Sequence, residues 1–568
     1  MRLRNLPAAL AAALLALPAG AQTPAAPPPI FGEMIDVRVV NLEVVVTDRD
    51  GLPVAGLTPA DFVLTVDGEE VSIDYFTEVR GGTAVELSAQ AGMIAGVPDL
   101  VPGTPVGTSY LLFVDDYFSV ERDRDQVLRG VREQLGQLGP ADRMAIVAYD
   151  GAKLEMLSSW SQSAPELERA LRKATDRPAH GLKRLSERRT QVEGNLAATG
   201  SRVGGRLDVH ELAYAEMLEQ QIANSVSAAA AALRGFAHPP GRKVFLLLSG
   251  GMPFDITEFV SRESAAARRD PLRPGGGRLG RSAVTSRDGS IGQPFQEPGI
   301  TQGERLLAPL VDTANRLGYT IFPVDVPGMD TAFDNSAEYP GSSREGTSFT
   351  AFLRENNTQY SLVHLAERTG GEALLNAGRL RALERAAAAT RTYYWLGFTP
   401  TWQRNDERHD VEVEVRRAGL SVTSRSDFVD TSRAAEVSMA VESVLLFGAG
   451  PNVRPLELTV TPAERSSLGR MRVDVSVAVP AGEITFLPDG ELNVAELELR
   501  VAAVDEAGAR SPIPVLPVRL AIPGTVDPAR PVTYSATLEL RRERNRLVVA
   551  LYDPAAGAIW SATTEVRP

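Results

Sequence analysis

The pattern of hydrophobic and polar positions differs between parts of this chain. Residues 36–80 alternate apolar and polar side chains with period two, and Asp50-Gly51 and Asp67-Gly68 interrupt the pattern as hairpin signals. We predict a small N-terminal β domain of about five strands there. Asp48 and Asp50 suit turn chemistry better than a calcium loop, because such a loop needs more oxygen ligands than DRDG supplies.

The middle of the chain has a different pattern of hydrophobic positions. Continuous apolar runs, YLLFVDD, RMAIVAY and KVFLLLSGG, alternate with amphipathic helical segments such as residues 120–138 and 207–236. Runs of this kind are typical of parallel strands that are buried on both faces. The sequence therefore predicts an α/β fold with a doubly wound, mostly parallel sheet, in which ligands bind beyond the carboxyl ends of the strands.

Short alternating runs return after residue 435, between Gly, Pro and Asp breaks, and predict a C-terminal β-sandwich. Gly/Pro-rich stretches and an Arg/Gly/Ser/Pro-rich stretch indicate linkers and a disordered insert. The expected division is a signal peptide 1–21, a linker 22–35, the N-terminal β domain 36–80, a linker 81–108, the α/β domain 109–400 with a disordered insert 262–300, a β-hairpin extension 401–430, and the sandwich 435–568.

The first residues indicate export. Arg2 and Arg4 precede an Ala/Leu run, and Ala19-Gly20-Ala21 forms an A-x-A cleavage pattern, so we expect cleavage after Ala21 by the Sec pathway. No later segment is apolar for long enough to span a membrane. The chain has no cysteine, which excludes disulfides and a lipoprotein anchor. We expect a secreted protein, periplasmic or extracellular, with no transmembrane segment after cleavage.

Net charge and short sequence motifs limit the classes of function that this chain can have. The net charge of −13 argues against nucleic acid as a partner. GGGRLG at 275–280 lacks the strand and helix of a dinucleotide site, HELAY at 210–214 lacks the second zincin histidine, and Ser249 stands in no G-x-S-x-G motif. We therefore expect no enzyme, no catalytic residues and no organic cofactor. The aromatic run TYYWLGF is interpreted as core in preference to a binding surface.

Several segments of the chain resemble a known protein family. The block from about residue 108 to 330 is similar to a von Willebrand factor type A (VWA) domain. Most of the mature chain up to about 430 resembles the secreted "VWFA-related domain" proteins best known from Acidobacteria. The matching pieces are VRVVNLEVVVTDRDGLPVAGLTPADFVLTVDG, the central α/β block, LAERTGGEALLN, and TYYWLGFTPTWQRNDERHDVEVEVRRAGLSVTSRSDF.

The resemblance implies a metal-ion-dependent adhesion site, in which a D-x-S-x-S loop, a Thr and an Asp hold Mg²⁺ or Ca²⁺. Asp115 matches the first Asp and Ser119 the second Ser, but Tyr117 replaces the first Ser. The T-D-G step aligns with Ser249-Gly250-Gly251, so the Asp is lost, and Arg206 stands near the place of the Thr. The site is thus predicted to be degenerate, with Asp116, Ser249 and Asp255 as possible helpers.

The alternative is that Asp115, Asp116 and Ser119 end a strand and cap the helix that begins near Val120. On either interpretation we expect a protein or peptide partner. The predicted contact face consists of Asp115, Asp116, Tyr117, Ser119, Ser249 and Gly250. A structural scaffold whose β domains make the contacts is the second hypothesis, and a secreted hydrolase the third. The sequence does not fix the oligomeric state.

Overall fold

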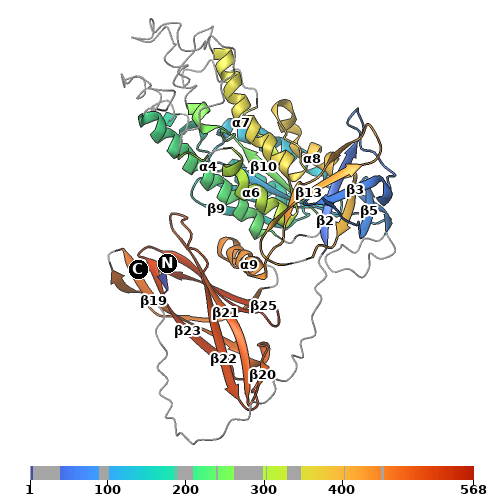
Figure 1. Cartoon of the computed structure of the whole chain (residues 1–568). Helices are drawn as coiled ribbons and strands as arrows, with labels where there is room; N and C mark the ends of the chain where they lie inside the picture. The colour runs from blue at the N-terminus through green and yellow to red at the C-terminus, as the bar shows by residue number, and fades with distance from the viewer. Residues whose placement is uncertain are drawn as a thin grey trace, which may run out of the picture. The chain divides into compact units, whose positions relative to one another are not determined.

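The computed structural model describes residues 2–3, 39–87, 102–183, 186–187, 207, 209–237, 239, 241–260, 299–301, 303–328, 347–401, 403–448, 453–467 and 469–568 (Figure 1). The predicted signal peptide apart from residues 2–3, the linker 22–35, most of the insert 262–300, and Arg206 lie outside these residues. The chain divides into two compact units, one around residues 40–451 and one around residues 452–568.

The larger unit contains a five-stranded sheet in the order β11-β10-β7-β8-β9. Strands β11, β10, β7 and β8 pair in parallel with their neighbours in this order, while β9, at one edge, is antiparallel to β8. This arrangement confirms the predicted doubly wound, mostly parallel sheet. The strands are β7 (Thr108–Asp115), β8 (Arg143–Tyr149), β9 (Leu154–Ser161), β10 (Arg242–Ser249) and β11 (Tyr319–Asp325).

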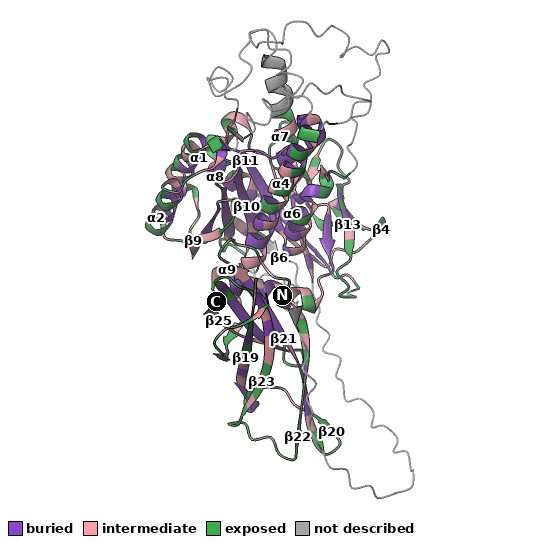
Figure 2. Cartoon of the chain, turned by 90° about the vertical axis from the view of Figure 1, so that its left-hand side faces the viewer, coloured by how far each residue is buried: buried purple, intermediate pink, exposed green. Residues whose placement is uncertain are grey.

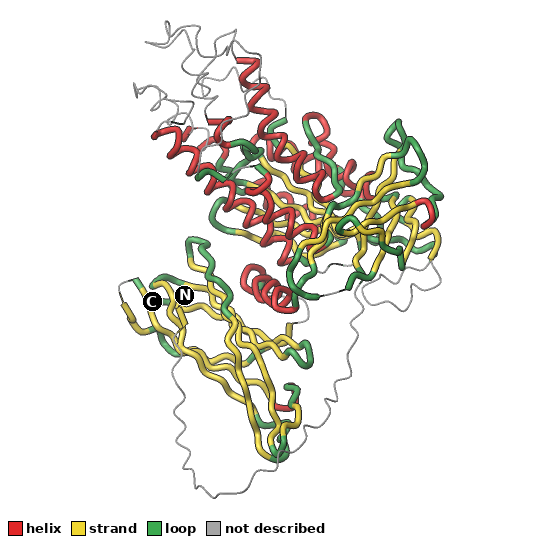
Figure 3. The backbone as a smooth tube through the Cα atoms, viewed as in Figure 1, coloured by secondary structure: helices red, strands yellow, loops and turns green. Residues whose placement is uncertain are grey.

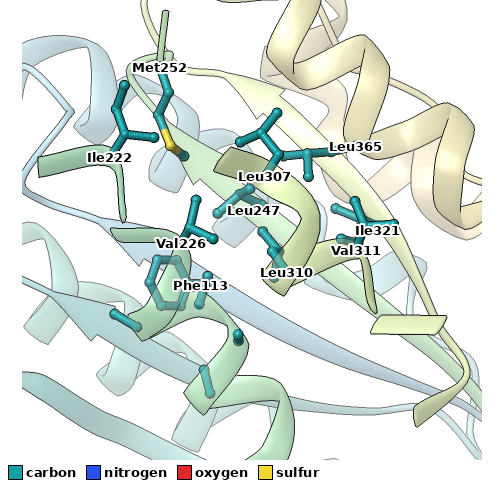
Figure 4. Packing of buried hydrophobic residues seen from close by; sticks show 14 of the residues in the cluster. Phe113, Ile222, Val226, Leu247, Met252, Leu307, Leu310, Val311, Ile321 and Leu365 are labelled. Atoms are coloured by element: carbon teal, nitrogen blue, oxygen red, sulfur yellow. The ribbon is translucent and has the colours of Figure 1, made fainter. Parts of the chain in front are cut away.

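Helices cover both faces of this sheet, because its strands are apolar on both sides (Figure 3). Figure 4 shows one face, where Phe113, Leu247 and Ile321 of the sheet meet side chains of three helices. Those helices are α4 (Val209–Gly235), α6 (Glu304–Leu317) and α7 (Thr347–Thr369). The opposite face packs against α1 (Glu121–Glu133), α2 (Ala164–Thr175) and α8 (Ala382–Thr390), with short 3-10 turns at Leu135–Gln137 and Asn376–Arg381.

The same unit contains an antiparallel β layer built from two distant parts of the chain. The order β14-β2-β12-β5-β6 places β12 between β2 and β5, and a second sheet has the order β15-β13-β3-β4. The N-terminal elements are β2 (Val40–Thr47), a 3-10 turn (Pro59–Asp61), β3 (Phe62–Val66), β4 (Glu69–Glu70), β5 (Tyr75–Arg80) and β6 (Thr83–Leu87). The later strands are β12 (Tyr393–Phe398), β13 (Arg408–Val415), β14 (Ser421–Thr423) and β15 (Asp427–Val429).

This layer changes the expected division of the chain. Residues 393–398 were expected in the α/β domain and residues 401–430 as a separate extension, yet both complete the N-terminal sheets. The reason is the apolar face of β12, whose Tyr394, Leu396 and Phe398 are buried in one core with β2 and β3. Residues 433–447, just before and within the expected sandwich, instead form helix α9 (Arg433–Phe447), which packs on α4 in the larger unit.

The second unit is a β-sandwich, as predicted, and its strand pairs are antiparallel apart from one parallel pair at an edge. Buried side chains of both sheets form one apolar core, and Figure 2 shows the buried residues along its strands. One sheet has the order β1-β23-β19-β17 with β18 beside β19, and the other β16-β25-β24-β21 with β20 and β22 beside β21. No helix in the described part of the chain is long and apolar enough to cross a membrane. The elements are β1 (Arg2–Leu3), β16 (Val453–Pro455), β17 (Glu457–Val460), β18 (Glu464–Ser467), β19 (Arg470–Pro480), a 3-10 turn (Ala481–Glu483), β20 (Leu487–Asp489), β21 (Leu492–Asp505), β22 (Val515–Pro523), β23 (Pro531–Arg541), β24 (Asn545–Asp553) and β25 (Ala558–Val566).

Candidate functional site

The carboxyl ends of four neighbouring strands carry a row of polar side chains. The register places Asp325 of β11 beside Ser249 of β10, and Asp115 of β7 beside Tyr149 of β8. Ser249 follows Leu248, which pairs with Val114, so Ser249 and Asp115 also end level with one another. Residues at matching positions of parallel strands point to the same face, here the face covered by α4, α6 and α7.

Asp115 is the centre of this row and is fully buried. One carboxylate oxygen accepts hydrogen bonds from the backbone N–H groups of Tyr117 and Phe118, at 3.2 and 3.1 Å. The other accepts from the hydroxyls of Ser225 and Ser249, at 3.0 and 2.9 Å. The carboxylate therefore fixes the turn after β7 and ties it to α4 and β10.

Asp116 is held by two arginines. Nη1 of Arg124 and Nε of Arg177 each lie 2.7 Å from a different oxygen of its carboxylate. The Asp116 and Arg124 side chains are both fully buried. Arg124 also donates to the backbone carbonyls of Thr175 and Arg177, at 3.1 and 2.9 Å. Burial raises the pKa of the Asp116 carboxyl, although hydrogen bonds and charge from Arg177 and Arg124 act to lower it.

Two glycines hold the backbone of this loop from either side. A Cβ atom on Gly250 would lie 1.7 Å from the carbonyl oxygen of Phe118, and one on Gly181 would lie 2.5 Å from that of Ser119. The N–H groups of His180 and Gly181 donate to the carbonyls of Asp116 and Ser119, at 2.7 and 2.9 Å. Residues 115–120 are thus packed between two other loops, and position 250 has no room for the aspartate of a T-D-G step.

The predicted helix cap is wrong in its details. Helix α1 has Val120 as its N-cap residue, and no side chain makes a capping hydrogen bond there. Asp115 and Asp116 are occupied by the contacts above, and the buried Ser119 hydroxyl has no hydrogen-bond partner in the described structure. The helper Asp255 accepts from the N–H of Glu258 at 2.7 Å, so its carboxylate caps the helical turn at residues 256–260.

The predicted contact face is largely internal. Asp115, Asp116, Ser119 and Ser249 are 0% exposed, so these side chains position the edge and cannot touch a partner directly. Tyr117 and Gly250 are half-buried. The Tyr117 ring lies over Gly151 and near the rings of Phe118 and His180, with centroid distances of 5.4 and 6.5 Å. Tyr117 is therefore the residue of the predicted face with the largest side chain at the surface.

The oxygens that could hold a cation belong to Asp115, Ser119, Ser225 and Ser249. The unpartnered Ser119 hydroxyl favours a ligand. The rest of the set does not fit a hard divalent cation, which takes six or more oxygens, among them one or two carboxylate groups in the case of Mg²⁺. Asp115 is the carboxylate of this set, and its two oxygens already accept four hydrogen bonds. The buried carboxylate of Asp325, at the end of β11, accepts a hydrogen bond from Gln359. Asp116 is neutralised by arginines, and Gly250 leaves no space for a second carboxylate.

Several residues of this site were missed from the sequence, among them Ser225, Asp325, Arg124 and Arg177. Ser225 lies within a long helix, where a serine gives no signal of its own. Asp325 ends the run TIFPVD in the way that Asp115 ends YLLFVD, and that parallel could have identified it. Its carboxylate is buried and accepts from Gln359 of α7 at 3.0 Å, and burial raises its pKa. Arg124 stands at a buried position of α1, and an arginine in an apolar stripe indicates a buried ion pair.

Two further predictions can be placed. Asp48 accepts from the N–H groups of Asp50 and Leu52, at 2.9 and 3.0 Å, which is turn chemistry. In TYYWLGF, Tyr393, Tyr394, Trp395 and Phe398 are at most 3% exposed, so the aromatic run is core and not a binding surface.

Comparison with solved structures gives matches of low identity and low TM-score. The vWF domain of the type V pili tip protein Mfa5 from Porphyromonas gingivalis is 14% identical and covers 50% of this chain and 95% of that chain, with a TM-score of 0.24. Three N-terminal domains of the same protein give 11% identity, coverages of 80% and 75%, and a TM-score of 0.26. The PilB minor pilin from Streptococcus sanguinis gives 9% identity, coverages of 63% and 87%, and a TM-score of 0.21.

These likenesses concern the fold and carry no weight on function, because identity and TM-score are both low. No family model matches the chain, and no curated protein matches it. The narrower resemblance to secreted VWFA-related proteins therefore stays a prediction.

Proposed function

We propose that this chain is a secreted binding protein, periplasmic or extracellular and not an enzyme, that holds a protein or peptide partner at the carboxyl-end edge of its parallel sheet. The observation that carries the proposal is the half-buried Tyr117 ring at this edge, whose backbone N–H donates to Asp115 in the buried row of Tyr149, Asp115, Ser249 and Asp325. Doubly wound sheets bind ligands at this edge. The proposed interaction includes adhesion, as the resemblance of the central block to VWA domains implies.

In this proposal the adhesion site is degenerate, and arginines replace the cation. In a metal-dependent site the cation would tie the strand-end loop to its neighbours. Here Arg124 and Arg177 supply positive charge from inside the protein and tie Asp116 to the segment after α2. The loop is therefore held in one conformation without metal, and the partner is expected to bind in the presence of EDTA.

Tyr117 is the expected anchor for the partner. A tyrosine at the centre of a contact combines a large apolar ring with a hydroxyl, and such residues often carry much of the binding energy. Its ring is supported from beneath by Phe118 and Gly151, so a partner would meet a fixed surface.

The test is capture of partners from the extracellular or envelope fraction of the producing cells, with immobilised wild type, Tyr117→Ala, and Leu487→Ala as a matched control. Leu487 is 49% exposed and lies in the other unit. We expect Tyr117→Ala to weaken capture about tenfold or more, while Leu487→Ala and EDTA leave it unchanged. Equal capture by Tyr117→Ala, or loss of capture in EDTA, would contradict the proposal.

The scaffold hypothesis predicts the opposite result. If the β domains make the contacts, removal of the second unit abolishes capture and Tyr117→Ala does not. The deletion should begin at Val453 and not at 435, because α9 packs on α4 in the larger unit. Arg234 of α4 is also paired with Glu442 of α9, so a cut at 435 would expose a buried contact of the domain under test.

A further inference from the structure

We propose that the C-terminal sandwich binds a second copy of this chain edge to edge through β23, as a two-fold symmetric antiparallel strand pair. This inference goes beyond the proposed function, because it concerns the other unit and none of the residues of the sheet edge described above.

The outer edge of β23 is open along most of its length. The strand pairs over all 11 of its residues with β19 on one side. On the other side, in the described part of the chain, it pairs with Arg2 and Leu3 at Glu539 and Leu538. Those two residues show that this edge accepts an antiparallel strand, and they belong to the segment expected to be removed after Ala21. If that segment is removed, no strand among the described residues pairs with this edge of β23.

The core beneath β23 is incompletely covered. Its inward side chains Val532, Tyr534 and Ala536 are half-buried, and they belong to the rim of the sandwich core. The residues paired with them on β19, namely Val479, Val477 and Val475, are at most 2% exposed. The difference arises because β19 has a neighbour on both sides and β23 does not. A strand added to β23 would cover these three side chains.

The other long edge of the sandwich is interrupted by prolines within the strand, and β23 is not. Strand β22 carries Pro517 and Pro523, which cannot donate a backbone hydrogen bond to an added strand, and the exposed charge of Arg519. After Pro531 at its start, β23 has no proline. Natural edge strands that lack such protection are templates for pairing with another chain.

The β23 sequence is complementary to itself. When two copies pair antiparallel over all 11 residues, Ala536 faces Ala536, Tyr534 faces Leu538, and Val532 faces Leu540 on the core side. On the outer side Ser535 faces Thr537, Thr533 faces Glu539, and Pro531 faces Arg541. No like charges meet, and Arg541 is already paired with Asp505 of its own copy at 2.8 Å. Two apolar faces thus join into one, and for this reason we assign a second copy as the occupant.

The pairing of Thr533 with Glu539 gives a charge test with a matched control. Thr533 is exposed, and its neighbour within the chain is Ala478, so a charge at 533 disturbs little in the monomer. Thr533→Glu places like charges opposite each other twice in the dimer, while Thr533→Lys places opposite charges there. Directly opposed charges on paired strands favour or oppose pairing by modest amounts, so we expect the dimer dissociation constant to rise and to fall, respectively, by about fivefold.

Sedimentation velocity over a concentration series of the chain from Gln22 measures these constants. Amide hydrogen exchange should slow at residues 532–541 as dimer forms and stay constant in β22. A monomer at every concentration, equal constants for the two variants, or dimerisation without protection of β23 would overturn the proposal. Capture through Tyr117 is measured separately and in the other unit, so either proposal can fail without the other.

Discussion

Replacing Arg124 with methionine is the most severe test of the proposal that Arg124 and Arg177 hold the strand-end loop through Asp116. The side chain is fully buried, and its loss leaves the Asp116 carboxylate with Arg177 as its single arginine partner. The carbonyls of Thr175 and Arg177 also lose their hydrogen bonds from Arg124. Removing one partner of a buried ion pair typically costs about 3–5 kcal/mol, so we expect a loss of that size in the free energy of unfolding of the larger unit.

The control is Arg122→Met in the same helix. Arg122 is 58% exposed and pairs at 3.1 Å with the buried carboxylate of Asp123. Because solvent reaches this arginine, its loss should cost clearly less than that of Arg124, whose ion pair with Asp116 is fully buried. Pulsed hydrogen exchange in urea, read by mass spectrometry on peptides of β7 and α1, reports the unfolding of the larger unit. Peptides of β24 report the second unit and should be unaffected by either variant.

A second substitution separates charge from packing. Asp116→Asn in the Arg124→Met background removes the incompletely paired buried charge, so the double variant should be more stable than the sum of the two single losses predicts.

The stability loss of Arg124→Met should also depend on pH in a definite direction. Burial already raises the pKa of Asp116, and loss of Arg124 raises it further, so the deficit of Arg124→Met should shrink from about pH 8 to pH 4.5 as Asp116 gains a proton. A loss equal to that of Arg122→Met, or one with no rescue and no pH dependence, would refute the reasoning.

Two further predictions concern packing and titration. Gly250→Ala should destabilise the larger unit by several kcal/mol, because its Cβ would lie 1.7 Å from the carbonyl oxygen of Phe118. The control Gly136→Ala, whose Cβ would have nothing within 4 Å, should leave stability unchanged or slightly raised. Urea midpoints of the two variants measure the difference. Burial lowers the pKa of Lys243 to about 8, so the folded state loses this proton before the unfolded state does, and stability should rise with pH above that value. Relative to Lys243→Met, wild type should gain about 2 kcal/mol between pH 7.5 and 9.5 in urea titrations, and parallel curves would contradict the assignment.

The sequence predicted those elements whose signal is local. Strands β7, β8, β10 and β11 are short continuous apolar runs, and Asp115 could be recognised because it ends such a run. Strand β9 was missed because LEMLSSWS is an edge strand with half-polar faces and no clear period. Helix α9 was taken for β structure because VESVLLF is a short apolar run, and periodicity alone does not separate a buried helix from a strand.

The parts that could not be predicted depend on pairing between distant residues. The sheet position of β12, beside β2 and β5, joins segments more than 300 residues apart, and nothing in TYYWLGF specifies that partner. The same holds for the hydroxyl of Ser225 on Asp115, and for Arg177 on Asp116. The departures from the adhesion-site pattern at Tyr117 and Gly250 were visible in the sequence, but the pairing of Asp116 with two arginines was not.

The central claim is that the strand-end loop is fixed by arginines and needs no cation. Its most direct test is Mn²⁺ binding, measured by electron paramagnetic resonance on chain first depleted with EDTA, for wild type and Asp115→Asn. The account predicts that wild type binds no more Mn²⁺ than Asp115→Asn at any concentration. Tight binding of one Mn²⁺ per chain that is lost in Asp115→Asn would contradict it.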